Sequence, residues 1–314
     1  MALAALSPVP ARPAETLRPV EVAGGGTAPT PWVDRVLTTS QGRVSIRETS
    51  GDGLPVLLLH GNSSCKEAFR AQMGGALGAR HRMVAIDFLG HGASEDAAEP
   101  DHSYTLLGYA DLVVEVAETL GLDRYALLGW SLGGHVALEA CASAPGIVGV
   151  LTVGAPPIGS DPSTMADAFR RGPFLQLGAQ AELSEAEVAA LVAVMGVDGH
   201  GDLVDAIRRA DGRARSRVMA DALAGGASDE RAVVEAMRVP LAVIDGADDA
   251  IVDGHYVDAL SYGSLWEGRR HVIPRAGHAP FLTAPDLFNA LLGRFLHDLD
   301  RKNPVSSLGL SLGG

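Results

Sequence analysis

Apolar residues along the chain form short continuous runs separated by longer amphipathic stretches. The runs predict strands at 56–59, 83–86, 125–128, 147–153, 241–244 and 271–273. Helical periodicity and helix-ending glycines predict helices at about 66–78, 104–120, 132–143 and 285–299. Continuously apolar strands between amphipathic helices indicate an α/β fold with a mostly parallel sheet covered on both faces.

The stretch 160–239 departs from this alternation because it contains helical segments with no clear strand between them. We expect a helical cap inserted after the sixth strand of a core made of 32–159 and 240–302. Residues 1–31 are rich in Pro, Ala and Gly, and 303–314 are rich in Gly and Ser, so we expect a flexible leader and a flexible tail.

The segment Gly129-Trp130-Ser131-Leu132-Gly133 lies between a predicted strand and a predicted helix. A serine between glycines at such a sharp turn is typical of a nucleophile, because its hydroxyl points out above the sheet at a helix N-terminus. The segment 309–313 has the same G-x-S-x-G pattern around Ser311, but no strand precedes it. We therefore interpret Ser311 as a chance match and Ser131 as the nucleophile.

The overall charge narrows the classes of partner. The formal net charge of −13 argues against nonspecific binding to nucleic acid or to an anionic membrane surface.

No apolar run is long enough to span a bilayer, and no basic region precedes an N-terminal apolar stretch, so we expect a cytoplasmic protein. No cluster has metal-ligand spacing, and no glycine-rich dinucleotide motif is present, so we expect no metal and no cofactor.

From 36 to 300 the sequence resembles the α/β-hydrolase superfamily, and within it the N-acyl homoserine lactonases of this fold. The segments that carry the likeness are 60–64, 103–104, 108–111, 129–135, 211–215, 265–268 and 277–281. Members have the chain order serine, acid, histidine, which is the order of a catalytic triad. The resemblance therefore implies a serine hydrolase that forms an acyl-enzyme.

The turn Ala276–Pro280 places His278 after the last strand, where its ring can reach the nucleophile as the base. The other histidines near it, His271 and His297, fall inside a strand and a helix and are expected to be structural. The resemblance implies that the acid lies three residues after Gly246, which selects Asp249. Asp248 remains an open alternative for the same role.

The resemblance also implies an oxyanion hole formed by the backbone N–H groups of Asn62 and Leu132. The Asn62 side chain is expected either to contact substrate or to shape the turn, and His60 to pin the loop. Trp130 is expected to line an acyl pocket. The cap has no tyrosine for a polar substrate contact, and Leu191 is expected at that place, contacting the substrate.

The preferred substrate is a small-molecule lactone, an N-acyl homoserine lactone. A carboxylesterase of other specificity and a C–C bond hydrolase share the same triad and remain alternatives. A ligand receptor that retains the triad is the alternative from another class. The cap arginines, including Arg208, Arg209, Arg213, Arg215 and Arg217, are interpreted as a solvated helical face.

Overall fold

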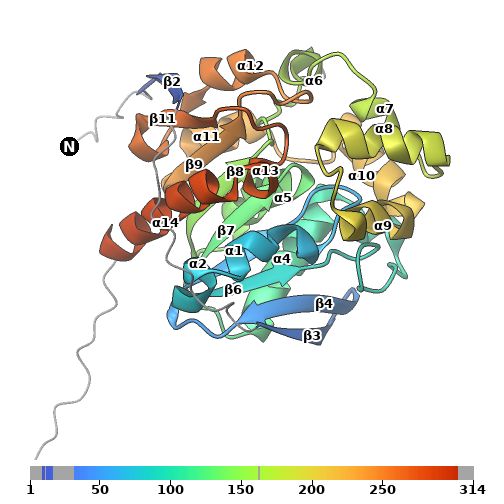
Figure 1. The fold of residues 1–314 in the computed structure, drawn as a ribbon, viewed down its shortest axis with the longest axis horizontal. Coiled ribbons are helices and arrows are strands. Elements are labelled where there is room, and N and C mark those ends of the chain that lie inside the picture. The colour runs from blue at the N-terminus through green and yellow to red at the C-terminus, as the bar shows by residue number, and fades with distance from the viewer. Residues whose placement is uncertain (1–8, 11, 17–31, 162, 303–314) are drawn as a thin grey trace, which may run out of the picture.

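The computed structural model describes residues 9–10, 12–16, 32–161 and 163–302. The predicted tail at 303–314, Ser311 within it, and much of the predicted leader lie outside the described residues. The described chain forms a nine-stranded sheet with helices on both faces (Figure 1). The prediction of an α/β fold with a mostly parallel sheet is confirmed.

The sheet has the strand order β2-β11-β9-β8-β7-β5-β6-β4-β3. Its strands are β2 (Arg12–Thr16), β3 (Trp32–Thr39), β4 (Gly42–Thr49), β5 (Gly53–Leu59), β6 (His81–Ile86), β7 (Tyr125–Trp130), β8 (Ile147–Val153), β9 (Leu241–Gly246) and β11 (Arg269–Ile273). All neighbours pair in parallel except β4, which is antiparallel to both β6 and β3. The carboxyl ends of the parallel strands therefore meet at one edge, where ligands of such sheets bind.

Helices cover the two faces and also make up the cap. They are η1 (Lys66–Phe69), α1 (Arg70–Met73), α2 (Ala76–Arg80), α3 (Pro100–Ser103), α4 (Leu106–Thr119), α5 (Leu132–Ser143), α6 (Ser163–Ala168), α7 (Phe174–Leu177), α8 (Glu185–Met195), α9 (Gly201–Arg209), α10 (Gly212–Leu223), α11 (Glu230–Ala236), α12 (Gly254–Ala259), η2 (Trp266–Gly268), α13 (Pro280–Thr283) and α14 (Pro285–Lys302). The single helix predicted at 66–78 is instead three short pieces, with a change from 3-10 to α-helix after Phe69 and a break at Gly74 and Gly75.

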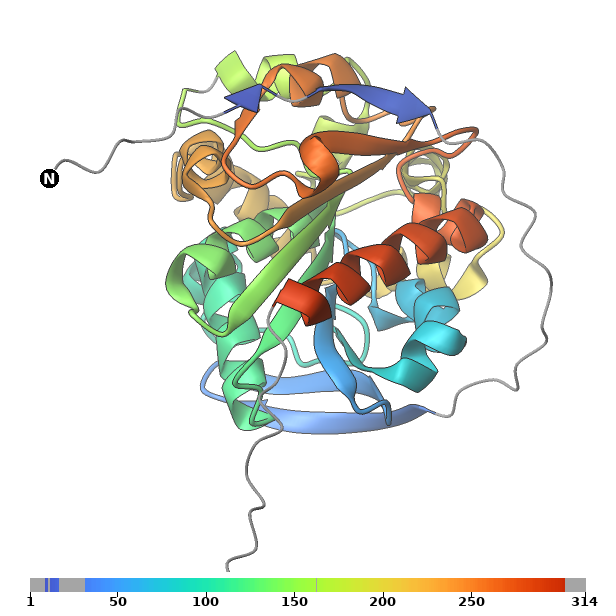
Figure 2. The same ribbon diagram turned by 90° about the vertical axis from the view of Figure 1, so that its left-hand side faces the viewer.

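Two apolar cores lie on opposite faces of the sheet. Alternate side chains of β5 enter different cores, with Leu57 and Leu59 in one and Val56 and Leu58 in the other. Figure 2 shows α14 and the first helices on one side of the sheet, and α4 and α5 on the other. Burial on both faces explains why these strands are apolar at every position. No described helix is both long and apolar enough to cross a membrane.

The N-terminal segment differs from the predicted flexible leader at two places. Residues 12–16 form β2, which pairs in parallel with β11, and Val9–Pro10 form β1, which pairs antiparallel with β10 (Ser261–Tyr262). Without β2, β11 would be the edge of the sheet with unpaired N–H and C=O groups. The sequence pattern did not predict this pairing because the segment is short and rich in proline.

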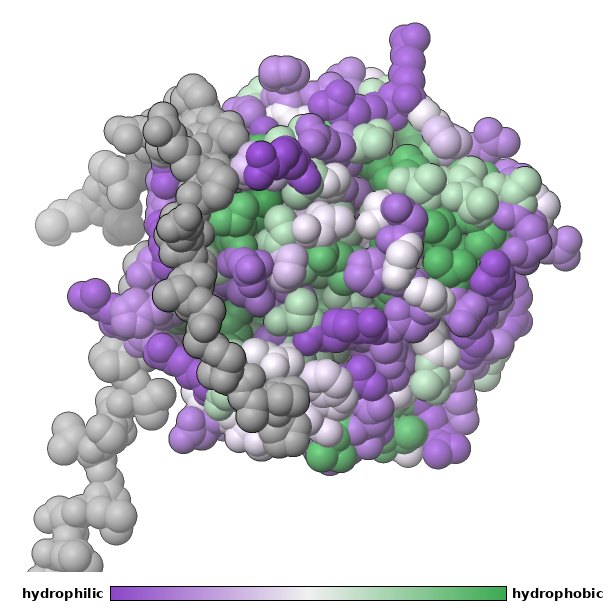
Figure 3. All heavy atoms as spheres, viewed as in Figure 1, coloured by the Kyte–Doolittle hydropathy of each residue, from purple (hydrophilic) through white to green (hydrophobic). Residues whose placement is uncertain are grey.

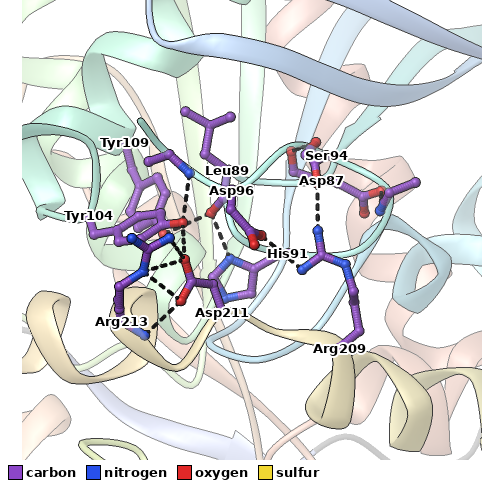
Figure 4. Close-up of polar contacts among 12 residues, drawn as sticks. Asp87, Leu89, His91, Ser94, Asp96, Tyr104, Tyr109, Arg209, Asp211 and Arg213 are labelled. Carbon is purple, nitrogen blue, oxygen red and sulfur yellow. Dashed lines mark hydrogen bonds and ion pairs between the residues drawn. The ribbon is translucent and has the colours of Figure 1, made fainter. Parts of the chain in front are cut away.

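Helices α6 to α10 come between β8 and β9 and form the cap, and α11 then packs against α5 of the core. Polar contacts hold the start of α10 to the loop that follows β6 (Figure 4). The Tyr104 hydroxyl donates to Asp211 Oδ2 at 2.7 Å and accepts the Ala97 N–H at 2.8 Å. Arg209 donates to the Ser94 carbonyl at 2.7 Å. The cap is therefore fixed at a definite place on the core.

The prediction of a solvated arginine face is wrong at one position. Arg208, Arg213 and Arg217 are exposed and paired with nearby carboxylates. Arg215, however, is only 4% exposed, because its helix face is turned toward the core. Elsewhere hydrophilic side chains cover much of the face shown in Figure 3, with apolar patches between them.

Candidate active site

Ser131 lies at a strained turn between β7 and α5. Its φ of 52° and ψ of −118° fall in a region that L-residues rarely adopt, and its N–H donates to the Val153 carbonyl at 2.8 Å. A Cβ on Gly129 would overlap the carbonyl oxygen of Gly133, and one on Gly133 would overlap that of Leu59. Only glycines fit on either side of the serine, so the motif glycines shape the turn that presents it.

His278 and Asp249 are joined by a hydrogen bond. His278 Nδ1 donates to Asp249 Oδ2 at 2.9 Å, and both side chains are buried. Asp249 Oδ1 accepts the N–H groups of Ile251 at 2.7 Å and Val252 at 3.1 Å. Burial raises the pKa of Asp249, but the charge and hydrogen bond of His278 and the two N–H groups outweigh it, so the pKa is lowered overall. Asp248, the alternative acid, is exposed.

The ring of His278 is held from several sides. Trp130 Nε1 donates to the His278 carbonyl at 3.0 Å, and the rings of Trp130 and Phe174 lie 5.8 and 5.9 Å from the imidazole. Gly154 packs so closely that a Cβ there would be 2.6 Å from His278 Cε1. Nε2 is buried and has no hydrogen-bond partner among the described residues. The packing therefore fixes the ring and leaves Nε2 for another group.

Asn62 and Leu132 have backbone N–H groups that donate no hydrogen bond to any described residue. Both residues line the same cavity as Ser131. The Asn62 side chain is turned to other partners, since Nδ2 donates to the Gly178 carbonyl at 3.1 Å and Oδ1 accepts from Ser63 Oγ at 3.1 Å. It therefore shapes the loop and ties it to the cap, while the residue also borders the cavity.

A cavity of about 1110 Å³, counting the space at its mouth, lies between core and cap above Ser131. Its floor includes Ser131 and Leu132 from the nucleophile turn. Apolar side chains of the cap form much of its wall, with Met165, Phe169, Phe174, Val218, Met219 and Leu223 among them. Ser131 is only 8% exposed. A ligand reaching the serine would therefore be surrounded mainly by apolar groups supplied by the cap.

Two predicted substrate contacts are not among the residues that line this cavity. Trp130 is fully buried, and its ring packs edge-on against Phe281 at 5.2 Å. Leu191 is 2% exposed and belongs to the apolar interior of the cap with the neighbouring α8 residues. Trp130 points into the core because successive strand residues face opposite sides, and Leu191 lies on the inner face of its helix.

Comparison with known proteins agrees with this architecture. Residues 56–291 match the Alpha/beta hydrolase family. The chain belongs to the α/β-hydrolase family. A mutant of the N-acyl homoserine lactonase AidH in complex with N-hexanoyl homoserine lactone is similar in structure, with a TM-score of 0.83 and 38% identity over 86% of this chain and 99% of that chain.

Two curated relatives of this α/β-hydrolase are pimeloyl-[acyl-carrier protein] methyl ester esterases. The enzyme of Nitrosomonas europaea is 28% identical over 77% of this chain and 95% of its own length. The enzyme of Xanthomonas oryzae pv. oryzae is 30% identical over 78% of this chain and 96% of its own length. Family and relatives together show a hydrolase of the esterase and lactonase type.

The sequence analysis of this hydrolase missed one charged pair in the cavity wall. His135 Nδ1 donates to Glu230, with 2.9 Å to each carboxylate oxygen, and both residues line the cavity. Ser131 directly precedes α5, and His135 lies one helical turn beyond it, with its N–H donating to the Ser131 carbonyl at 3.2 Å. That spacing was a usable signal for His135, whereas nothing in the sequence pointed to Glu230.

His60 is buried and has the structural role that the sequence suggested. Its Nδ1 donates to the Gly61 carbonyl at 2.7 Å, and its Nε2 accepts the Phe88 N–H at 3.1 Å. Burial lowers the pKa of His60 to about 4, so the ring is neutral and can accept at Nε2. It therefore connects the loops that follow β5 and β6, close to Asn62.

Proposed function

We propose that this hydrolase opens N-acyl homoserine lactones through an acyl-enzyme on Ser131. The observation that carries the proposal is the strained Ser131 on the floor of a cap-covered, largely apolar cavity. The His278–Asp249 pair supplies the base and the group that orients it. The likeness to the lactonase AidH supports the choice of substrate.

The mechanism follows from these positions. Ser131 Oγ attacks the lactone carbonyl carbon while His278 Nε2 takes the hydroxyl proton, and Asp249 stabilises the imidazolium. The N–H groups of Asn62 and Leu132 donate to the developing oxyanion. Collapse breaks the ring C–O bond, and His278 returns the proton to the departing oxygen. Water, activated by the same histidine, then hydrolyses the acyl-enzyme to the free carboxylic acid.

The leaving hydroxyl stays attached to the acyl group when the substrate is a ring. It can attack the acyl-enzyme and close the lactone again, so net turnover requires that water reach the ester first. The apolar cap side chains Phe174, Met165 and Met219 offer a surface for the acyl chain. This position replaces the sequence-based prediction that the acyl chain lies against Trp130, which is fully buried in the core.

The test is acid release in a pH-stat with N-hexanoyl homoserine lactone, with Ser131→Ala as the blank. We expect turnover by the wild-type protein and a loss of at least about a thousandfold in the variant. The serine-to-alanine change removes only the hydroxyl, so circular dichroism should show an unchanged fold. Wild-type release no faster than the blank would contradict the lactonase proposal.

A carboxylesterase that acts on open-chain acyl esters is the second candidate. The two methyl ester esterase relatives favour it, because the chain aligns with nearly their whole length. The same triad would cleave such an ester, with methanol leaving instead of a tethered hydroxyl. A methyl ester of a medium-chain acid, assayed beside the lactone, separates the two by their kcat/KM. Turnover of a vinylogous diketone would indicate a C–C bond hydrolase. Release of one equivalent of product without further turnover would indicate a receptor.

A further inference from the structure

The pair His135–Glu230 is a charged group in an otherwise largely apolar cavity wall, and the mechanism above does not use it. His135 belongs to the nucleophile helix α5, and Glu230 is the first residue of α11. Both are largely buried, with side-chain exposures of 14% and 3%. Burying charged groups is costly even when they are paired, so their presence beside the nucleophile calls for a reason.

Glu230 fixes the orientation of the imidazole. Its two oxygens both lie 2.9 Å from His135 Nδ1, and Oε2 also accepts the Ile158 N–H at 2.8 Å. One turn further along α5, Glu139 accepts the N–H and the hydroxyl of Ser228 at 2.7 and 2.8 Å. Hydrogen bonds therefore hold the loops at Ile158 and Ser228 on either side of the His135 ring, and the ring has little freedom to rotate.

These contacts determine the charge state of His135 and which of its ring nitrogens has a partner. Burial lowers the pKa of His135, but the charge and hydrogen bond of Glu230, with a contribution from Glu139, outweigh it and raise the pKa overall. Nδ1 is occupied by Glu230, and Nε2 has no hydrogen-bond partner among the described residues. Because Nδ1–H is donated to Glu230, the ionised ring of this pair carries a second N–H at Nε2, which no described residue accepts.

We propose that His135 Nε2–H binds a second hydrogen-bond acceptor of the substrate, so that the preferred substrates carry a carbonyl oxygen next to the scissile ester or lactone. This inference rests on the proposed acyl-enzyme chemistry at Ser131. Ser131 directly precedes α5 and its carbonyl accepts the His135 N–H at 3.2 Å, so the two residues are one helical turn apart and line the same cavity, which suits two groups of one small ligand. In an N-acyl homoserine lactone only the ring Cα and the amide nitrogen separate the two carbonyl carbons.

This subsite also explains selectivity in physical terms. A substrate without the second carbonyl would leave the His135 N–H without an acceptor in an apolar surrounding, which costs binding energy. A purely apolar wall would accept long-chain esters of every kind. The charged pair therefore selects amide-bearing acyl compounds from among molecules of the same length.

The experiment compares matched substrates with and without the amide, in both ring and open-chain form. The lactone pair is N-hexanoyl homoserine lactone and an α-alkyl-γ-butyrolactone of equal chain length. The ester pair is methyl N-hexanoylglycinate and methyl nonanoate, in which methylenes replace the amide. Each is assayed with the wild-type protein, with His135→Phe and with Glu230→Gln, and thermal unfolding of each variant checks its fold.

We expect His135→Phe to lower kcat/KM for the amide-bearing substrates by about 10- to 100-fold, the range of a hydrogen bond to a charged donor. The substrates without an amide should change by less than about threefold, which is under 1 kcal/mol. Glu230→Gln keeps a hydrogen-bond acceptor for His135 and should show the same selectivity with a smaller loss.

An equal loss on both members of a pair would overturn the subsite and leave His135 a structural role. No loss on either would overturn it as well. If the wild-type protein hydrolyses the esters but neither lactone, the proposed lactonase function fails, and the ester pair alone decides the subsite. The two failures are therefore distinguishable.

Discussion

Arg215 of the cap donates a hydrogen bond from Nη1 to Ser63 Oγ of the core loop, over 3.0 Å. Ser63 in turn donates to Asn62 Oδ1, and its own φ of +58° is unfavourable for a serine. The same guanidinium donates to the cap carbonyls of Gln180 at 2.7 Å and Ala181 at 3.1 Å. A buried cap arginine therefore connects the cap backbone to the loop that holds Asn62.

We expect Arg215→Met to lower the free energy of unfolding by about 2–3 kcal/mol, because carbonyl groups buried with it would lose their donor. The matched control is Arg217→Met on the same helix. Arg217 is 44% exposed and pairs with the more exposed Asp101, so its loss should change stability by less than about 0.5 kcal/mol. Urea unfolding measures the free energy of unfolding of both variants. Equal stabilities of the two variants would contradict the buried role of Arg215.

The Asp249–His278 hydrogen bond predicts which of two adjacent aspartates supports turnover. Asp249→Asn should lower kcat by roughly a thousandfold or more, because an amide does not stabilise the imidazolium. Asp248→Asn should leave kcat nearly unchanged, since Asp248 is exposed and it is Asp249 that accepts the hydrogen bond of His278 Nδ1. The measurement is kcat on the best substrate found. Loss of turnover in Asp248→Asn alone would exchange the two roles.

The close packing of Gly154 against His278 predicts that a single added methyl group at this position removes most of the activity. A Cβ there would lie 2.6 Å from His278 Cε1 and 2.8 Å from Nδ1, so the ring must move. A displacement of about 1 Å can cost a hundredfold in rate. We therefore expect Gly154→Ala to lower kcat/KM by about that factor.

Gly121→Ala is the matched control for this prediction. Gly121 has a φ of +65°, close to the +59° of Gly154, but nothing lies within 4 Å of a Cβ there. Backbone strain at positive φ should lower the stability of both variants by about 1 kcal/mol, and Gly154→Ala should lose more because its Cβ also displaces the buried His278 ring. Only Gly154→Ala should lose activity, and a similar activity loss in both would attribute the effect to strain alone.

The His135–Glu230 pair predicts a pH dependence of stability. The pKa of His135 is raised in the folded protein, so the pair stabilises fully below the unfolded value of about 6.5 and less as the pH rises through the folded pKa. Glu139 and Glu230 are the carboxylates that face the ring. The wild-type advantage over His135→Gln in free energy of unfolding should be larger at pH 6 than at pH 9. An advantage that grows with pH would contradict the ionised pair.

Local patterns were sufficient for the parts of the site that depend on local geometry. The turn around Ser131 is dictated by glycines within two residues of it, so the sequence predicts it well. The parallel strands are apolar throughout because both faces are buried, which makes them easy to recognise. The hairpin of β3 and β4 and the edge strand β2 lack that signal, since β3 is exposed along most of its length and β2 is short.

Contacts between distant segments could not be predicted from one sequence. His135 and Glu230 are 95 residues apart, and Arg215 and Ser63 are 152 residues apart. Periodicity places each residue on a helix face but does not say which face meets which loop. For the same reason Leu191 looked like a substrate contact, although the packing of the cap helices turns it inward.

Most of the cavity wall comes from the chain between two strands that are hydrogen-bonded neighbours, β8 and β9. The residues that carry the proposed chemistry, Ser131, Asp249 and His278, all lie outside that interval. Changes at cap side chains that line the cavity without contacting His278 or Asn62 can therefore alter which acyl groups fit, while the reacting groups keep their geometry. For protein engineering, the cavity-lining cap positions between Ile158 and Ser228, apart from Phe174 beside His278, are therefore the ones to vary in a combinatorial library that searches for new specificity.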